Sequence, residues 1–211
     1  LDKCRQAGVQ ADFISGDLSA ETAASVEDVY GQAMAANPNI DILVNNAGTY
    51  IDQPFLEMDL ETFDKTMKLN VYSCFFLTQQ FARRWVAGKI AGRVLFIGSI
   101  NGRLAEEVHA AYDSSKGAVE AMVKSLCVSL APHNIRVNAV GPGSIDTAMM
   151  ASVNADLGAM EMVMSRTPLK RMGTPREIGD VVAFLVSDKA SYITGETIYV
   201  DGGRIGMNYT M

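Results

Sequence analysis

The chain alternates between apolar runs and amphipathic stretches along nearly its whole length. The longest runs are almost continuously apolar, which is typical of parallel strands covered on both faces. The expected strands lie at 11–16, 40–46, 92–99, 134–143 and 196–203. Stretches with helical periodicity separate them, at about 20–34, 59–86, from 110 onward and 174–187. Strands that alternate with helices predict an α/β fold: a doubly wound parallel sheet of the Rossmann type, with helices on both faces.

Capping signals fix several helix ends. Asp59 precedes the long helix as a predicted N-cap, and Thr174 with Glu177 forms a capping box around Pro175 at the first helical position. The first residues resemble the end of a helix that Gly8 terminates. There is no internal repeat, low-complexity segment or linker, so we expect residues 1–211 to form one domain.

Small and polar residues follow the predicted strands. In a doubly wound sheet, ligands bind outside the carboxyl ends of the strands, and small residues let a ligand approach the backbone. The residues at these ends are Asp17-Leu18, Asn45-Asn46-Ala47-Gly48, Ser99 and Gly141-Pro142-Gly143-Ser144-Ile145-Asp146-Thr147. Each group alone is ordinary turn chemistry, but four groups at one sheet edge predict a binding site.

The charge balance excludes some partners. The formal net charge is −6, whereas nucleic acids and anionic membranes attract a basic surface. The apolar runs are too short to span a bilayer. Three widely spaced cysteines form no metal motif and indicate reduced thiols, and neither histidine has a partner at ligand spacing. We therefore expect a cytoplasmic protein without a metal, a membrane or a nucleic-acid partner.

Tyr112 and Lys116 stand four residues apart at the start of a predicted helix, on one helix face. A free tyrosine has a pKa of about 10, too high for a base at neutral pH. A neighbouring ammonium stabilises the phenolate, and the positive charge of an oxidised nicotinamide would add to this effect. The pair therefore predicts a tyrosine acid/base, against the alternative of a solvated helix face.

Together these motifs resemble the short-chain dehydrogenase/reductase family over about residues 11–203. The resemblance depends on their order and spacing, with Ser99 thirteen residues before Tyr112. A Tyr-x-x-x-Lys match alone is weak. The matching segments are Asp17, 45–48, Asn70, Ser99, Tyr112 with Lys116, 142–147 and 200–203.

The resemblance implies an NAD(P)-dependent oxidoreductase that acts on CH–OH groups. Tyr112 would be the acid/base, Ser99 would bind the substrate oxygen, and Asn70 would anchor a water on a proton path from Lys116. NAD or NADP would be the cofactor, and Lys116 would also hold its nicotinamide ribose. The implied cofactor-binding residues are Asp17, Leu18, Asn45, Ala47, Gly48, Tyr112, Lys116, Pro142, Gly143, Ile145 and Thr147.

One part of the family pattern has no counterpart in these residues. The first strand, the glycine-rich turn and the second strand would precede Leu1, and the segment 98–103 lacks the G-x-G-x-x-G spacing. We therefore expect an N-terminal part that is missing here, whose absence would leave the strand at 41–44 with an unpaired edge. The choice between NAD and NADP would depend on that part.

The substrate is less clear from the sequence. His109, one turn before Tyr112, and Met149, in the methionine-rich segment 147–164 where the family has a lid, would contact it. The stretches "FARRW", "SINGRLAE" and "DGGRIGMNYT" are similar to sugar or polyol dehydrogenases of the family. The alternatives are a 3-oxoacyl-carrier-protein reductase and a non-enzymatic nucleotide-binding protein. The acidic charge opposes the first, because its carrier-protein partner is acidic too.

Two predicted helices carry apolar residues on more than one face. One sheet covers only one stripe of a helix, so the surplus predicts partner helices from a second subunit. The family resemblance implies a homotetramer, with the segment 199–211 at another interface. The apolar residues concerned are Phe75, Phe76 and Phe81 on the first helix, and Val119, Met122, Val123 and Leu126 on the second.

Overall fold

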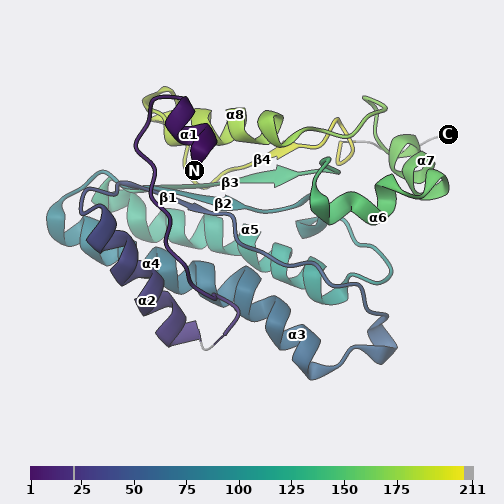
Figure 1. Ribbon diagram of the computed structural model, residues 1–211, viewed down its shortest axis with the longest axis horizontal. Coiled ribbons are helices and arrows are strands. Elements are labelled where there is room, and N and C mark those ends of the chain that lie inside the picture. Colours follow the sequence, from purple (N-terminus) through teal and green to yellow (C-terminus); the bar gives the residue numbers. More distant parts are fainter. Residues whose placement is uncertain (21, 207–211) are drawn as a thin grey trace.

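Four parallel strands form the sheet of the computed structural model, which describes residues 1–20 and 22–206. The strands are β1 (Ile42–Asn45), β2 (Arg93–Ile97), β3 (Arg136–Pro142) and β4 (Thr197–Val200), side by side in chain order. Every neighbouring pair is parallel, with Val44 opposite Leu95 and Phe96 opposite Ala139. The predicted fold class is confirmed, and the carboxyl ends of all four strands meet at one edge (Figure 1).

Helices cover both faces of the sheet (Figure 1). On one face lie α2 (Thr22–Ala36), α4 (Ser73–Gly88) and α5 (Ala110–Leu130), and on the other lies α8 (Pro175–Val186). The remaining helices are α1 (Asp2–Gln6), α3 (Leu60–Met67), α6 (Ala151–Asn154) and α7 (Leu157–Ser165). Among the described residues, none of these helices is both long enough and apolar enough to cross a membrane.

Each face of the sheet has its own apolar core. The larger one joins α2, α4 and α5 to the strands around Trp85, which is completely buried and donates its indole N–H to Ile40. The smaller one packs Leu185 of α8 against Leu95 and Val140. Alternate residues of β2 and β3 therefore enter different cores, which explains why both strands are apolar without interruption.

The predicted helix ends agree with the structure. Asp59 accepts a hydrogen bond from the backbone of Thr62, and Thr174 and Glu177 form the complete capping box. Gly8 follows α1 at φ 79°, in the left-handed conformation that favours glycine. The helix predicted from Asp59 is interrupted by a π-helical segment, Lys68–Tyr72, between α3 and α4.

Two predictions for the first part of the chain are wrong. Residues 11–16 form no strand, because the described residues place no strand beside them with which they could pair. The strand at 40–46 is present as β1 but is not buried on both faces, since Ile42 and Val44 are 37% and 39% exposed. Among the described residues, β1 pairs with β2 alone and is an edge strand.

Candidate active site

Tyr112 and Lys116 lie in the first turns of α5, where the helix passes the carboxyl ends of β2 and β3. Lys116 is only 7% exposed, and its ammonium lies 5.5 Å from the centre of the Tyr112 ring. Its Nζ donates a hydrogen bond of 2.9 Å to the carbonyl of Ile97, the last residue of β2. The pair therefore faces the sheet and is not a solvated helix face.

Ser99 follows β2 and caps a short 3₁₀ helix, Ile100–Gly102. Its Oγ accepts a hydrogen bond from the backbone N–H of Asn101 at 3.1 Å, and its side chain is close enough to Tyr112 to oppose the rise in the pKa of that phenol. Asp113 supports this loop, since its carboxylate accepts from the Asn101 side chain at 2.7 Å and from the Glu106 backbone at 3.1 Å. These hydrogen bonds fix the loop that places Ser99 beside the Tyr112 phenol.

Asn70 lies in the π-helical segment and is 3% exposed. Its side chain pairs with both backbone groups of Thr49, at 2.8 and 2.9 Å, and donates to Ser115 at 3.0 Å. Asn70 therefore ties the loop after β1 to the helix that carries Tyr112. Single-turn π segments are common at functional sites. The predicted proton path through a water on Asn70 is not tested by these contacts.

Burial shifts the pKa values of the pair. It raises the pKa of Tyr112, an effect that the hydrogen bond from Ser99 partly opposes and the Asp113 charge adds to. Burial also lowers the pKa of Lys116 to about 8. The sequence predicted a phenol pKa lowered by the ammonium. The structure differs, because the ammonium lies over the ring face while desolvation disfavours both charged forms.

The residues after the strands lie at the same edge as Ser99, but their contacts differ. A Cβ at Gly48 would stand 3.3 Å from Asn70 Oδ1 and 3.8 Å from Lys116 Nζ, so the glycine keeps the space beside the ammonium open. Asn45 instead turns its amide toward α4 and donates to Thr78 at 3.0 Å. The exposed Ala47 follows in the same loop.

The turn after β3 continues this edge. The backbone N–H of Gly143 bonds to Val200 at 3.0 Å, and Ile145 forms an isolated bridge with Gly173. A Cβ at Gly143 would stand 2.7 Å from Asp201, so the turn after β3 packs directly on the chain after β4. Pro142 ends β3, and Thr147 precedes the 3₁₀ helix Ala148–Met150.

Asp17 and Leu18 lie in the segment that forms no strand. The carboxylate of Asp17 accepts hydrogen bonds from the backbone and the hydroxyl of Ser19, at 2.8 and 2.6 Å, which lower its pKa. Leu18 packs against the larger core. No contact of the described residues links Asp17 to Tyr112, Lys116 or Ser99, so its cofactor role stays a prediction.

The substrate side contains residues that the sequence analysis did not identify. His109, predicted there, is 6% exposed, while Met149 is 55% exposed on the segment that leads into α6. Tyr50, Asp52, Glu106 and Arg204 join His109 in a polar cluster next to Tyr112. Four of these five lie in irregular loops, and no motif spacing identifies them. The segment 199–211, predicted at an interface, is described only to residue 206.

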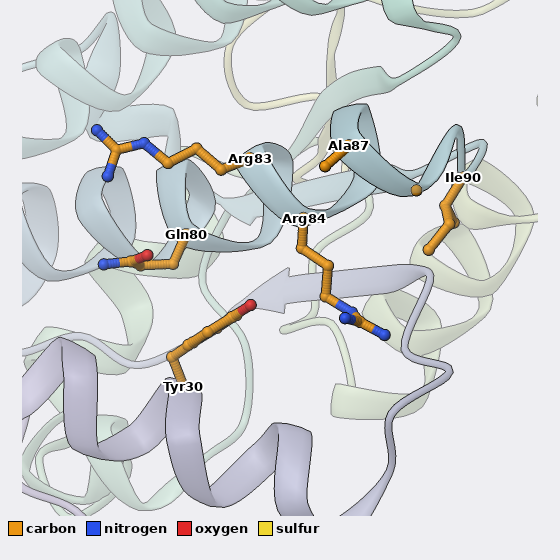
Figure 2. Close-up of a pocket in the computed structure, with 7 residues that line it drawn as sticks. Tyr30, Gln80, Arg83, Arg84, Ala87 and Ile90 are labelled. Carbon is orange, nitrogen blue, oxygen red and sulfur yellow. The ribbon is translucent and has the colours of Figure 1, made fainter.

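A surface hollow of about 550 Å³ lies elsewhere, between α2 and α4. Figure 2 shows Tyr30 and Arg84 projecting from these two helices into the gap between them. The other residues that line this hollow are Gln80, Arg83, Ala87, Gly88 and Ile90. None of the predicted catalytic residues lines this hollow, so it is separate from the candidate active site.

Comparison with known proteins agrees with the geometry. The family model described as enoyl-(acyl carrier protein) reductase matches residues 3–204. The chain is 35% identical to a glucose 1-dehydrogenase of Gluconobacter oxydans, over 93% of this chain and 73% of that protein. It is 37% identical to a 3-oxoacyl-[acyl-carrier-protein] reductase of Aquifex aeolicus, over 93% of this chain and 77% of that protein.

A solved structure with the same fold is a gluconate 5-dehydrogenase from Burkholderia cenocepacia in complex with NADP and tartrate. It superposes with a TM-score of 0.91 at 29% identity, and the match covers 98% of this chain and 80% of that one. The matched family model and relatives show an oxidoreductase that uses a nicotinamide dinucleotide. The chain belongs to the short-chain dehydrogenase/reductase family. The predicted activity class, a dehydrogenase or reductase that acts on CH–OH groups with NAD or NADP, is confirmed.

Proposed function

We propose that the protein transfers hydride between NAD or NADP and a secondary alcohol or ketone of the sugar or polyol class. The observation that carries this proposal is the partly buried Tyr112, which lies beside Ser99 and has the Lys116 ammonium 5.5 Å from its ring centre. Similarity to a glucose 1-dehydrogenase supports the substrate class.

The proton chemistry belongs to Tyr112. When a ketone is reduced, the Tyr112 hydroxyl donates its proton to the substrate oxygen, on which negative charge develops. The Ser99 hydroxyl donates a hydrogen bond to the same oxygen and stabilises this charge. When an alcohol is oxidised, Tyr112 takes the proton back. Asn101 and Asp113 hold the Ser99 loop, so both hydroxyls can meet one oxygen.

The residues around Lys116 fit a nicotinamide ribose. An ammonium has three N–H donors, and the described residues give it one hydrogen-bond acceptor, the carbonyl of Ile97. The space that Gly48 keeps open beside Nζ would admit the ribose hydroxyls, which supply further acceptors. The bound nicotinamide provides or accepts the hydride, and its positive charge in the oxidised form lowers the pKa of a nearby phenol.

The wider set of residues proposed to hold the dinucleotide lies along the strand ends and in the first loop. A dinucleotide bound there would keep its reactive ring near Ser99 and Tyr112, as the fold requires. The proposed residues are Asp17, Leu18, Asn45, Ala47, Gly48, Tyr112, Lys116, Pro142, Gly143, Ile145 and Thr147. Asn70 would hold a water between Lys116 and solvent.

A 3-oxoacyl-carrier-protein reductase is the second candidate, supported by the 37% identity to the Aquifex aeolicus enzyme. Its substrate carries an apolar acyl chain on an acidic partner. The net charge of −6 opposes such a partner, and the groups beside Tyr112 are polar. These observations favour the sugar or polyol class.

We also propose a cytoplasmic homotetramer. The three cysteines are free thiols, which suits a reducing compartment. Val71, Tyr72, Phe75, Phe76 and Met122 line an apolar hollow of about 500 Å³ on α4, α5 and the preceding π segment. Tyr72 and Phe76 remain 45% and 44% exposed there, and a second copy would cover them. Phe81, Val119 and Val123, expected to face a partner, instead lie in the core.

A direct test incubates the protein with NAD or NADP and a panel of sugars, polyols and simple secondary alcohols, and follows the absorbance of the reduced nicotinamide. We expect turnover that Tyr112→Phe lowers by orders of magnitude while dinucleotide affinity stays nearly unchanged, because the change removes one hydroxyl. Tyr72→Phe, which removes an exposed hydroxyl, is the matched control and should keep wild-type rates. A Tyr112→Phe rate within about tenfold of wild type would contradict the assignment.

A further inference from the structure

Tyr112 has aromatic neighbours on its substrate side. The ring of Tyr50 meets the Tyr112 ring edge to face, with centroids 5.3 Å apart, and meets the His109 ring at 4.8 Å. Tyr50 comes from the loop after β1, and His109 is the N-cap of α5. A substrate whose carbon reacts at Tyr112 therefore has its next atoms close to these residues.

Hydrogen bonds fix the orientation of Tyr50. Its hydroxyl lies 2.7 Å from His109 Nε2, which is also 3.1 Å from Asp52 Oδ1. Burial and the Asp52 carboxylate raise the pKa of Tyr50, which keeps the phenol neutral. Asp52 is 56% exposed, so its carboxylate can also accept hydrogen bonds from a ligand.

Glu106 and Arg204 close the other part of the cluster. The Arg204 guanidinium donates to Glu106 Oε1 at 2.6 Å and to Ser144 Oγ at 3.3 Å, and its side chain is 10% exposed. The second oxygen of Glu106 lies 3.5 Å from His109 Nδ1. Arg204 follows β4, Ser144 follows β3 and Glu106 precedes α5, so the ion pair spans the strand ends where Ser99 lies.

The charges of this cluster select against anions. Among its described residues, Arg204 is the only guanidinium or ammonium group, and Glu106 already neutralises it. Asp52 adds a further carboxylate. A substrate carboxylate would meet the negative charge of Asp52, and to reach Arg204 it would have to displace Glu106. Hydroxyl groups suit the same surface, because each can donate to Asp52 or Glu106 and accept from a neighbouring donor.

We propose that Glu106 and Arg204 act as a charge filter that makes the enzyme prefer neutral polyhydroxy substrates, aldoses or polyols, over aldonates. Asp52 and Tyr50 bind hydroxyl groups next to the reacting carbon. The inference rests on the proposed function, hydride transfer at Tyr112, and adds the substrate class at that site.

The test compares kcat/KM for glucose, gluconate and a short 3-oxoacyl thioester, with both nicotinamide dinucleotides, in the wild type and in Glu106→Gln. Glutamine keeps the shape of Glu106 and can still accept from Arg204, but it no longer cancels the guanidinium charge. We expect wild-type preference for glucose, and a shift of the gluconate-to-glucose ratio by about tenfold or more toward gluconate in Glu106→Gln. Glu107→Gln, which removes the same charge from an exposed neighbour, should leave the ratio within about twofold.

The outcomes distinguish a failure of the charge filter from a failure of the proposed function. Wild-type preference for gluconate, or an unchanged ratio in Glu106→Gln, overturns the charge filter, whereas preference for the thioester overturns the sugar or polyol class. Either result leaves hydride transfer in place if turnover still depends on Tyr112. The charge filter is also overturned if none of the three probes reacts while simple secondary alcohols do. Absence of Tyr112-dependent turnover with every substrate of the panel overturns the proposed function together with the filter.

Discussion

Tyr112 and Lys116 both lie largely out of contact with water, which disfavours the charged form of each side chain. Desolvation raises the phenol pKa and lowers the ammonium pKa to about 8, although attraction between phenolate and ammonium would act in the opposite direction. An additional positive charge beside the pair would favour the phenolate form of Tyr112. In the proposed mechanism, the phenol would therefore stay neutral in the free protein and would serve as a base when a cationic nicotinamide is bound.

Replacing Lys116 by methionine should impair both turnover and dinucleotide binding. The ammonium supports the phenol and, in the proposed site, donates to the ribose hydroxyls, so one change removes both interactions. We expect a fall in kcat of orders of magnitude and a rise in the dinucleotide Kd of about tenfold or more. Fluorescence titration and steady-state kinetics check this. Lower turnover with unchanged dinucleotide affinity would refute the ribose contact, and Lys124→Met on exposed α5 surface is the control.

The lowered pKa of Lys116 also predicts how the free energy of unfolding depends on pH. The pKa of Lys116 is about 8 in the folded protein and about 10.5 in the unfolded chain, so the unfolded state binds more protons between these values. The free energy of unfolding of the wild type should therefore rise relative to Lys116→Met as pH increases from about 8 to 10.5. The full change is on the order of 3 kcal/mol. Urea unfolding of both proteins without dinucleotide at pH 7 and 10 measures it, and a pH-independent difference would exclude the buried ammonium.

At the level of single residues, sequence reasoning finds those that follow a fixed motif spacing. Ser99, Tyr112 and Lys116 were predicted together, and the structure places them together. Tyr50 and Arg204 were not predicted, because their positions depend on how the loops after β1 and β4 fold back across the sheet. Such long-range contacts leave no periodic signal in the chain.

At the level of elements, the stretch 59–88 shows how one irregular turn interrupts a predicted helix. The chain was predicted as one helix from Asp59, but residues Lys68–Tyr72 are π-helical between α3 and α4. Asn70 lies in this segment, and its side chain forms hydrogen bonds with Thr49 and Ser115. Helical periodicity cannot reveal a one-turn change, whereas the end caps, which depend on local side chains, were predicted correctly.

The capping box of α8 should contribute measurably to stability. Thr174 accepts from the backbone of Glu177, whose carboxylate bonds back to Thr174 and to Arg171 at 2.6 Å. We expect Thr174→Ala to lower the free energy of unfolding by about 1 kcal/mol, because the first turn loses a hydrogen-bond acceptor. Urea unfolding checks it. Thr147→Ala removes an N-cap threonine that makes no side-chain cap bond, so it should change stability far less.

For the whole molecule, the sequence predicted the layered α/β arrangement and the order of the elements. Strands β2 and β3 were identifiable because each is covered on both faces and is therefore apolar throughout. The segment 11–16 has the same local pattern and forms no strand. A β-strand forms when its backbone hydrogen-bonds to a neighbouring strand. Among the described residues, no strand lies beside residues 11–16. Pattern alone cannot show whether that neighbour exists.

Self-association is the prediction that belongs to the molecule as a whole. Exposed Tyr72 and Phe76 surround the apolar hollow on α4 and α5, a surface of the kind that subunit interfaces cover. We expect light scattering at micromolar concentration to give the mass of a tetramer, four times 22.7 kDa for this chain. Phe76→Asp should shift the mass toward smaller species, because it places a carboxylate in the proposed contact. Leu157→Asp, at an 83% exposed leucine on α7, should leave the mass unchanged. A monomeric wild type would rule out the interface, and equal effects of both variants would place the contact elsewhere.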